Sequence, residues 1–263
     1  MPSSKLEGES MVWKLRLPKS RSMRISIALG TLACVFLFVS QRHVAACMVA
    51  SHGGYTSVGD GFFAAESEQE ADLVRVRAQW SSARARVVEL LGPLESEPIV
   101  VLPPSKKTAA RFGVPEVAPG GSYSVPWVTY IVLAPDGRNV DVMAHELVHA
   151  ELAARLGYVQ YQLALPTWFD EGLAMQVDLR DEKIARVIRE GVPLPPVSEL
   201  ITVRDFHRGE VALSYAASQL EVAAWLSRPG HPGARRFVDA LAARGDFAAV
   251  YPQVDSDFRA DHR

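Results

Sequence analysis

The sequence predicts an α+β fold in which a small N-terminal sheet precedes a mainly helical C-terminal half. Three observations support this class: residues 69–92 have helical spacing, short β-branched runs follow at 98–102 and 127–133, and the segments after residue 140 are helical. The chain has 263 residues, 48% of them hydrophobic and 22% charged, which is ordinary for a globular protein. Its length is sufficient for one good-sized core.

Residues 1–46 have the composition of a targeting segment. They carry seven Lys or Arg against two acids, and the stretch 25–40 within them has no charge. A basic leader before a short apolar run is the layout of a secretory signal, and the small residues at 44 and 46 suit cleavage after Ala46. The alternative is an uncleaved membrane anchor over 25–50. In both cases we expect the body of the chain to be exported to the periplasm or cell envelope, either held at the membrane or secreted.

The two cysteines both lie near this segment. Cys34 falls in the apolar run and Cys47 directly follows residues 1–46, so the body has no internal disulfide. Val44-Ala45-Ala46-Cys47 resembles the lipobox of bacterial lipoproteins, which makes Cys47 a candidate lipidation site. The polar residues 41–43 between the apolar run and this box weaken the match.

The chain after residue 46 is mildly acidic, with a net charge of −7. Nothing in it indicates a polyanionic partner, so we expect no binding of nucleic acid. Residues 47–68 are rich in Gly, Ser and Ala and predict a linker. Residues 69–263 then form one domain, divided into 69–179, which carries the sheet, and a helical part, 180–263.

The first elements of this domain follow from local spacing. Apolar residues recur at intervals of three and four through 69–92 and predict a helix that Gly92-Pro93 ends. Residues 98–102 predict a short buried strand, and 105–112 predict a short helix.

The next elements are separated by Gly and Pro. Residues 113–126 contain several of both and predict a loop. The strongest strand pattern is 127–133, which is β-branched and aromatic. A helix from about 140 to 156, a loop, and a helix from about 167 to 179 follow, before the helical remainder.

Residues 141–152 read DVMAHELVHAEL and carry the residues that indicate chemistry. His145 and His149 are four residues apart on the predicted helix, so both imidazoles project from one face and can bind one ion. In an H-E-x-x-H site the two imidazoles bind zinc, and the glutamate, here Glu146, accepts a proton from water as the general base.

The five-residue motif alone also fits a surface helix with two solvated histidines. The flanking residues favour the metal site, because Met143, Leu147, Ala150 and Ala154 form an apolar stripe that predicts burial of one side of the helix. Two histidines and a glutamate within a buried helix must be paired to offset their desolvation, and a metal ion pairs them.

The third ligand distinguishes classes of such sites. One class continues as H-E-x-x-H-x-x-G-x-x-H, but Leu152 and Arg155 occupy the Gly and final His positions. The alternative is a glutamate on a following helix, and Glu171 in the segment PTWFDEGLA fits this position. We expect Thr167 to cap that helix, with Asp170 at its third position. Two His and one Glu leave the fourth zinc position open, as a catalytic site requires.

HELVH followed by WFDEGLA resembles the peptidase MA-like family within the gluzincins, distant relatives of thermolysin and aminopeptidase N. The resemblance covers residues 95–180 well and 181–255 loosely. It implies a zincin-like catalytic domain with one Zn²⁺ held by His145, His149 and Glu171, with Glu146 as the general base. The implied activity is that of a zinc metallopeptidase.

The sequence departs from thermolysin in two ways. The connection from His149 to Glu171 is longer, which predicts a longer loop over 157–165. Thermolysin-like enzymes also carry an Asp shortly after the Glu that orients a ligand histidine, whereas Met175 stands four residues after Glu171. Asp178 is a weak substitute for that orienting residue, and we interpret Asp170 as a cap or an orienting group rather than a ligand.

Such enzymes also need a donor for the developing oxyanion. Tyr215 is the candidate, with an ordinary core aromatic as the alternative. His207 and His231 are weaker candidates, because isolated histidines are usually structural or solvated.

We expect the substrate to bind along strand 127–133, which precedes the metal helix. In gluzincins such a strand lies at the cleft edge and pairs with an extended peptide, so Trp127, Thr129 and Tyr130 are candidate substrate-binding residues. The alternative is a plain core strand. Residues 120–123 are a candidate loop over the cleft. The amine-capturing motif of aminopeptidases is missing before His145, which favours an endopeptidase.

Two functions from different classes remain. The first is a metalloprotease acting on peptides or proteins outside the cytoplasm and attached to the membrane through its N-terminal segment. The second is a catalytically idle zinc-binding module for interaction or assembly in the cell envelope. The presence of Glu146 favours the enzyme, because a domain without activity has no need of the general base.

Overall fold

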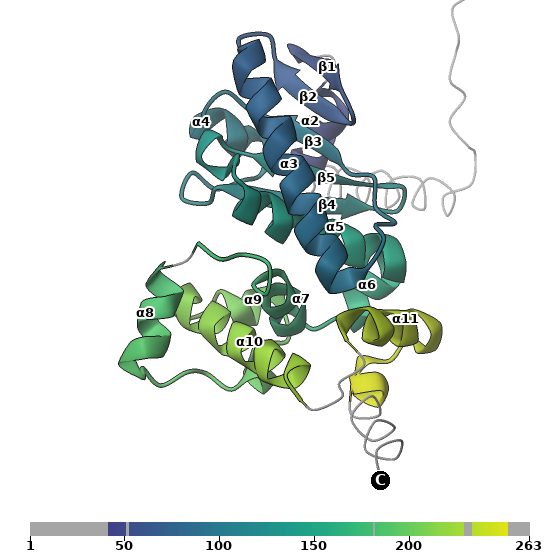
Figure 1. Cartoon of the computed structure of the whole chain (residues 1–263), viewed down its shortest axis with the longest axis vertical. Coiled ribbons are helices and arrows are strands. Elements are labelled where there is room, and N and C mark those ends of the chain that lie inside the picture. The colour runs from purple at the N-terminus through teal and green to yellow at the C-terminus, as the bar shows by residue number, and fades with distance from the viewer. Residues whose placement is uncertain (1–41, 51–52, 181, 229–232, 252–263) are drawn as a thin grey trace, which may run out of the picture. The chain divides into compact units, whose positions relative to one another are not determined.

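The computed structural model describes residues 42–50, 53–180, 182–228 and 233–251. The chain divides into two compact units, 1–42 and 43–263, and both the fold and the site belong to the second. This unit has an α+β architecture in which a five-stranded mixed sheet precedes a mainly helical C-terminal half (Figure 1). The fold class predicted from the sequence is confirmed.

The sheet has the strand order β1-β2-β3-β5-β4. Its strands are β1 (Tyr55–Gly59), β2 (Phe62–Ala65), β3 (Ile99–Leu102), β4 (Gly120–Val125) and β5 (Val128–Leu133). β1 and β2 pair antiparallel, as do β4 and β5, whereas β3 is parallel to both β2 and β5. Among the described strands β4 pairs only with β5 and therefore forms one edge of the sheet.

Two segments predicted to be irregular are strands instead. β1 and β2 lie within 47–68, which we predicted as a linker, and β4 lies within 113–126, which we predicted as a loop. In β4 the glycines serve close packing, because a Cβ on Gly120 would lie 2.9 Å from Cγ1 of Val142. The glycine-rich composition of these segments therefore led to a prediction of irregular structure, although main-chain pairing stabilises them as strands.

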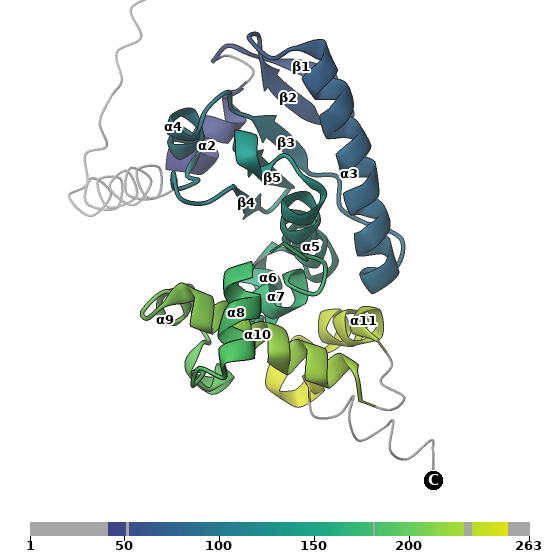
Figure 2. The same ribbon diagram turned by 60° about the vertical axis from the view of Figure 1, so that its left-hand side comes forward.

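Helices cover both faces of the sheet (Figure 2). α3 (Glu70–Leu91) and α5 (Val140–Leu156) pack on one face, and α2 (Arg42–Met48) and α4 (Lys106–Ala109), with the 3₁₀ turn Ala110–Phe112, lie on the other. The strands alternate between these layers: Ile131 and Leu133 contribute to the core with α5, and Tyr130 and Val132 contribute to the second cluster. The predicted helices 69–92, 105–112 and 140–156 and strands 98–102 and 127–133 are confirmed within one or two residues.

α5 is the central helix of the fold and is buried along most of its length. It begins where the Asn139 side chain accepts a hydrogen bond from the Val142 amide, and it ends at Gly157. Glu151 is fully buried and accepts hydrogen bonds from the amides of Glu95 and Ser96 and from Arg155 Nε, at 2.7–3.1 Å. These bonds fasten the segment before β3 to α5.

The helical half completes the unit. Its helices are α6 (Tyr158–Ala164), α7 (Thr167–Ala174), α8 (Glu182–Glu190), α9 (Val203–Phe206), α10 (Val211–Leu226) and α11 (Ala234–Arg244), with a 3₁₀ turn at Val197–Glu199. The predicted loop over 157–165 therefore contains a helix, and the helix predicted over 167–179 ends five residues earlier. α7 packs mainly against α10 and also contacts α5.

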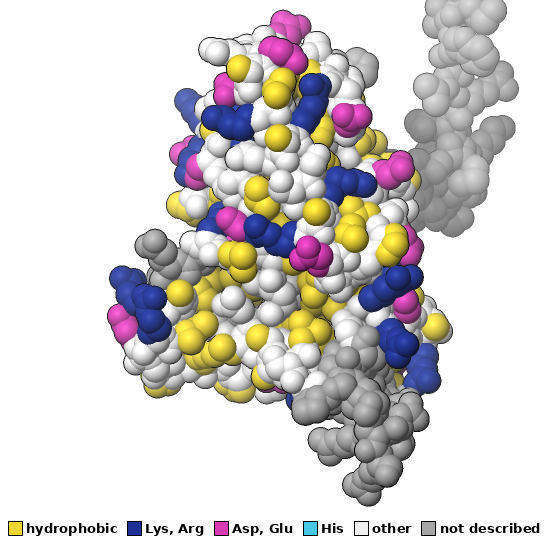
Figure 3. Space-filling view, viewed as in Figure 1, with side chains coloured by type: hydrophobic (Ala, Val, Ile, Leu, Met, Phe, Trp, Pro, Cys, Tyr) yellow, Lys and Arg dark blue, Asp and Glu magenta, His cyan; other side chains and the backbone are white. Residues whose placement is uncertain are grey.

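Positive and negative side chains are interspersed on the face shown in Figure 3, without a large area of one sign. In the part of the chain that the structure describes, no helix is both long and apolar enough to span a bilayer. The apolar run 25–40 lies outside the described residues.

Candidate metal centre

His145, His149 and Glu171 form a group that could hold a metal ion. One ligand atom from each lies within 4.8 Å of the others. Oε2 of Glu171 is 3.3 Å from Nε2 of His145 and 3.7 Å from Nε2 of His149. The two histidines lie on α5 and are 7% and 6% exposed, so α5 and α7 together build a site of two buried histidines and one partly buried glutamate.

α7 carries Glu171 to this position because it is fixed at both ends. The amides of Thr167 and Trp168 donate to the carbonyls of Ile201 and Leu200, at 2.9 and 3.1 Å. The predicted side-chain cap by Thr167 is therefore wrong: Pro166 is the N-cap, and main-chain carbonyls of a later loop satisfy the free amides.

Packing holds the rest of α7. Trp168 and Phe169 enter a cluster of aromatic rings formed with Trp225, Phe237, Phe247 and Tyr251. Gly172 meets α10 so closely that a Cβ on it would lie 2.5 Å from the Ser218 carbonyl oxygen. The Trp, Phe and Gly of the WFDEG segment thus serve packing, while its two acids face the site.

The donor set fits a metal ion such as Zn²⁺. Oε2 of Glu171 is buried and has no hydrogen-bond partner among the described residues, although it faces two imidazole nitrogens. A buried carboxylate oxygen without a partner is costly, and a cation between the three groups would remove that cost. Two imidazoles and one carboxylate are also the ligand types found in catalytic zinc sites.

The charge state of Glu171 suits this role. Burial would raise the pKa of its carboxyl, but the imidazoles of His149 and His145 and a hydrogen bond from Tyr215 lower it to about 2. The side chain is therefore an anion at any physiological pH.

His149 is held by a carboxylate. Its Nδ1 lies 2.7 Å from Oδ1 of Asp170, whose Oδ2 accepts a hydrogen bond of 2.9 Å from the Tyr161 hydroxyl. Burial would lower the pKa of His149, but the charges of Asp170 and Glu171 and the bond to Asp170 raise it to about 10. The orienting contact predicted for Asp170 is confirmed.

His145 has a looser carboxylate neighbour. Its Nδ1 lies 3.5 Å from Oδ2 of Asp178 and makes no hydrogen bond within the part of the chain that the structure describes. Asp178 is 3% exposed and is bound by Arg180, whose Nε and Nη2 lie 2.9–3.2 Å from its two oxygens. Asp178, the weak candidate for an orienting residue, therefore lies beside His145.

Glu146 lies next to the metal group and faces the sheet edge. Its Oε1 lies close to β4, 3.3 Å from the position of a Cβ on Gly120. Burial raises the pKa of Glu146 above its ordinary value, and the charge of Glu171 adds to this, whereas His145, His149 and Ser122 oppose it. A raised carboxyl pKa brings this group closer to the range in which a general base works at neutral pH.

Tyr215 on α10 also belongs to the group. Its ring centroid is 6.3 Å from that of His145. Burial, together with the charges of Glu171 and Glu146, raises the pKa of Tyr215 well above its ordinary value, so the hydroxyl is neutral and can donate.

The predicted substrate strand is not the edge strand. β5, which contains Thr129 and Tyr130, lies between β3 and β4, and both side chains are buried. Trp127 stands in the turn between β4 and β5 and is 70% exposed. The edge nearest to Glu146 is β4, so residues 120–123, predicted as a loop over the cleft, are the strand that borders the site.

The other candidates lie apart from the metal group or outside the described residues. His207 is exposed after α9, with Nδ1 2.9 Å from the Val203 carbonyl, and His231 is not described. Cys47 is 4% exposed in the cluster on the second face of the sheet, and burial raises its pKa to about 12. A lipidated Cys47 would have to leave that cluster.

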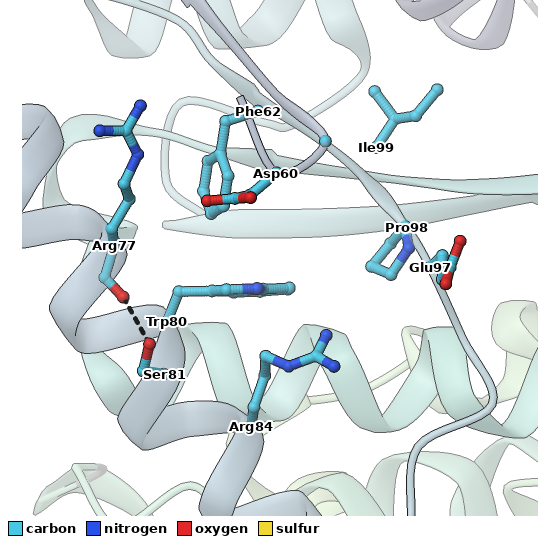
Figure 4. A pocket seen from close by; sticks show the side chains of 10 residues that line it. Asp60, Phe62, Arg77, Trp80, Ser81, Arg84, Glu97, Pro98 and Ile99 are labelled. Carbon is cyan, nitrogen blue, oxygen red and sulfur yellow. Dashed lines mark hydrogen bonds between the residues drawn. The ribbon is translucent and has the colours of Figure 1, made fainter. Parts of the chain in front are cut away.

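A cavity of about 610 Å³ lies elsewhere, between α3 and the strands β2 and β3 (Figure 4). Trp80 faces it, with Arg77 and Arg84 on either side along α3. It contains no residue of the metal group.

No pattern in the sequence pointed to Tyr161, Ser122 or Arg180. Tyr161 lies on a seven-residue helix that is too short for a periodic pattern, and Ser122 lies on a strand concealed by its glycines. No protein-family model matches the chain, and no curated protein matches it. The case for function therefore rests on the geometry of the metal group and of the residues around it.

Proposed function

We propose that this chain is a zinc-dependent peptidase of the gluzincin type, with peptides or proteins outside the cytoplasm as substrates. The observation that carries the proposal is the unpartnered Oε2 of Glu171, which faces Nε2 of both His145 and His149 beside a buried Glu146. An interaction module could use the three ligands alone, but it has no use for a fourth, base-forming carboxylate at the same place.

A zinc ion held by the three ligands would supply a Lewis acid and would lower the pKa of water enough to make it a nucleophile near pH 7. Glu146 would accept a proton from the attacking water and would deliver it to the leaving amine. The raised pKa of Glu146 favours both proton transfers. A carboxylate of ordinary pKa is a weaker base toward water, and it would lose the proton before the amine leaves.

Tyr215 is the proposed donor for the developing oxyanion. Its hydroxyl is neutral, and it reaches the metal group from α10, on the side of Glu171. A donor that strengthens its bond only as negative charge develops on the carbonyl oxygen lowers the barrier without tightening substrate binding.

We propose that the substrate backbone pairs with the free edge of β4. This strand borders the site, since a Cβ on Gly120 would lie 3.3 Å from Oε1 of Glu146, and in the described sheet only β5 occupies its other side. An extended peptide added there would gain main-chain hydrogen bonds and pass the general base.

The far end of β4 offers room for substrate side chains. A cavity of about 400 Å³ there is lined by Ser124 and Thr129 of the hairpin and by Ala150 of α5, one helical turn after Glu146. The exposed Trp127 also lines it, and it shares Tyr158 with an adjoining cavity along α6, where Val159 and Leu163 are exposed. We propose that apolar substrate residues bind at this end.

The proposed location is the periplasm or cell envelope, with the N-terminal segment at the membrane. It is supported by the basic leader and the uncharged run 25–40. Whether that segment is cleaved, retained as an anchor or lipidated at Cys47 does not alter the proposed chemistry.

The test is hydrolysis of a mixed peptide library by the full chain in detergent, with and without zinc, beside Glu146→Gln. We expect zinc-dependent cleavage by the wild type, and a loss of at least about a thousandfold in the variant, which retains its zinc. Equal cleavage by the variant would show that Glu146 is not the base. Zinc binding with no cleavage by either protein would favour the idle envelope module.

A further inference from the structure

We propose that Tyr161 is a positioning residue for the metal ligand His149 and acts through Asp170. The inference rests on the zinc site of the proposed function and assigns a role to the additional helix between the two ligand-bearing helices. Neither the H-E-x-x-H motif nor the downstream glutamate contains this residue.

The chain of contacts is short and continuous. The Tyr161 hydroxyl is 2.9 Å from Oδ2 of Asp170, and Oδ1 of Asp170 is 2.7 Å from Nδ1 of His149. Asp170 is adjacent to the ligand Glu171 on α7, and its side chain is 17% exposed. Both of its oxygens are thus occupied, one by a donor from α6 and one by the histidine ring.

The direction of these bonds determines which nitrogen of His149 faces the metal. The tyrosine hydroxyl donates to Asp170, so the carboxylate remains an acceptor and takes the Nδ1–H of His149. The lone pair is then on Nε2, the nitrogen that lies 3.7 Å from the unpartnered Oε2 of Glu171. Without Tyr161 the carboxylate could rotate, and the ring would lose its fixed orientation.

α6 is built in a way that favours this role. None of its residues is fully buried, and Val159 and Leu163 are 66% and 82% exposed, so it contributes little to the core. Gln160 donates to the Leu241 carbonyl of α11 and holds the helix in place. The Tyr161 hydroxyl is the group of α6 that reaches the site. The longer connection between His149 and Glu171 provides the residues that form this helix.

The two ligand histidines differ in this respect. Nδ1 of His145 lies 3.5 Å from Asp178 and makes no hydrogen bond, whereas His149 has a short bond to a carboxylate that is itself held. The inference therefore predicts unequal effects, with substitutions on the His149 side weakening metal binding more than those on the His145 side.

The test is zinc affinity, measured by competition with a chromophoric chelator on the full chain in detergent. Removal of an outer group that orients a metal ligand costs about 10- to 100-fold in affinity. We expect about tenfold weaker binding in Tyr161→Phe and about 10- to 100-fold in Asp170→Asn. The matched control is Tyr158→Phe on the same helix, whose exposed side chain should leave zinc affinity unchanged.

A double-mutant cycle separates positioning from general damage. Because Tyr161 acts through Asp170, the double variant should bind zinc no more weakly than Asp170→Asn alone. Wild-type affinity in Tyr161→Phe, or losses that multiply in full in the double variant, would overturn the inference while leaving the peptidase proposal intact. A wild type that binds no zinc would overturn both, and a wild type that binds zinc but cleaves nothing would overturn only the peptidase.

Discussion

Oε2 of Glu171 on α7 lies 3.3 Å from Nε2 of His145 on α5 and has no hydrogen-bond partner in the described part of the chain. Such an approach of a buried carboxylate and an imidazole depends on how α7 is seated against α5 and α10. The metal group is therefore a product of packing as much as of its three ligands, and packing variants should affect metal binding.

Gly172→Ala should disturb the site without touching a ligand. The added Cβ would lie 2.5 Å from the Ser218 carbonyl oxygen, so α7 and α10 must separate. We expect a loss of about 1–3 kcal/mol in the free energy of unfolding, together with weaker zinc binding. Thermal unfolding and zinc titration measure both.

Gly209→Ala is the matched control, because no atom lies within 4 Å of a Cβ built there. It should change neither property. Unaltered stability and zinc affinity in Gly172→Ala would show that the contact between α7 and α10 does not position Glu171.

Zinc affinity should rise with pH across the neutral range. Asp170 and Glu171 raise the pKa of metal-free His149 to about 10, so below that pH zinc must displace a proton from it. Glu171, with a pKa of about 2, releases none. We expect the affinity to increase about tenfold per pH unit between pH 7 and 8.

Calorimetric titration at pH 7 in buffers of different ionisation enthalpy measures the proton released. A plateau of affinity above about pH 7, as for a histidine of ordinary pKa, would contradict the arrangement of the two carboxylates around His149.

Trp127→Ala should weaken the binding of peptides with apolar residues near the cleaved bond. The side chain is 70% exposed at the turn after β4, beside the proposed subsite. Loss of about 1.4 kcal/mol of uniform binding would raise KM about tenfold and leave kcat unchanged. Steady-state kinetics on a cleaved apolar peptide measures this.

Val74→Ala, on the exposed side of α3, is the control and should behave as the wild type. A fall in kcat with no change in KM would place Trp127 in a different role from substrate binding.

The long periodic elements and the metal motif were accessible from the sequence. α5 presents two histidines four residues apart on a helix with an apolar stripe, and local spacing suffices to predict both the helix and the shared face. Glu171 was accessible because the residues around it form a second recognisable segment.

The features that could not be predicted from the sequence depend on contacts between distant segments. β4 has no alternating pattern, since it is half-buried throughout and carries two glycines, so only its pairing with β5 identifies it as a strand. Because β4 lies at the edge of the sheet, the proposed substrate-binding strand is 120–125 rather than 127–133. Tyr161 and Asp170 likewise meet through tertiary packing, which no local spacing encodes.

The central claim is that His145, His149 and Glu171 hold one zinc ion. The most direct measurement is zinc content by mass spectrometry on the purified full chain, with Glu171→Ala beside the exposed control Glu199→Ala. We predict about one zinc ion per chain in the wild type and in the control, and little in Glu171→Ala. No zinc in the wild type, or an equal content in Glu171→Ala, would contradict the account.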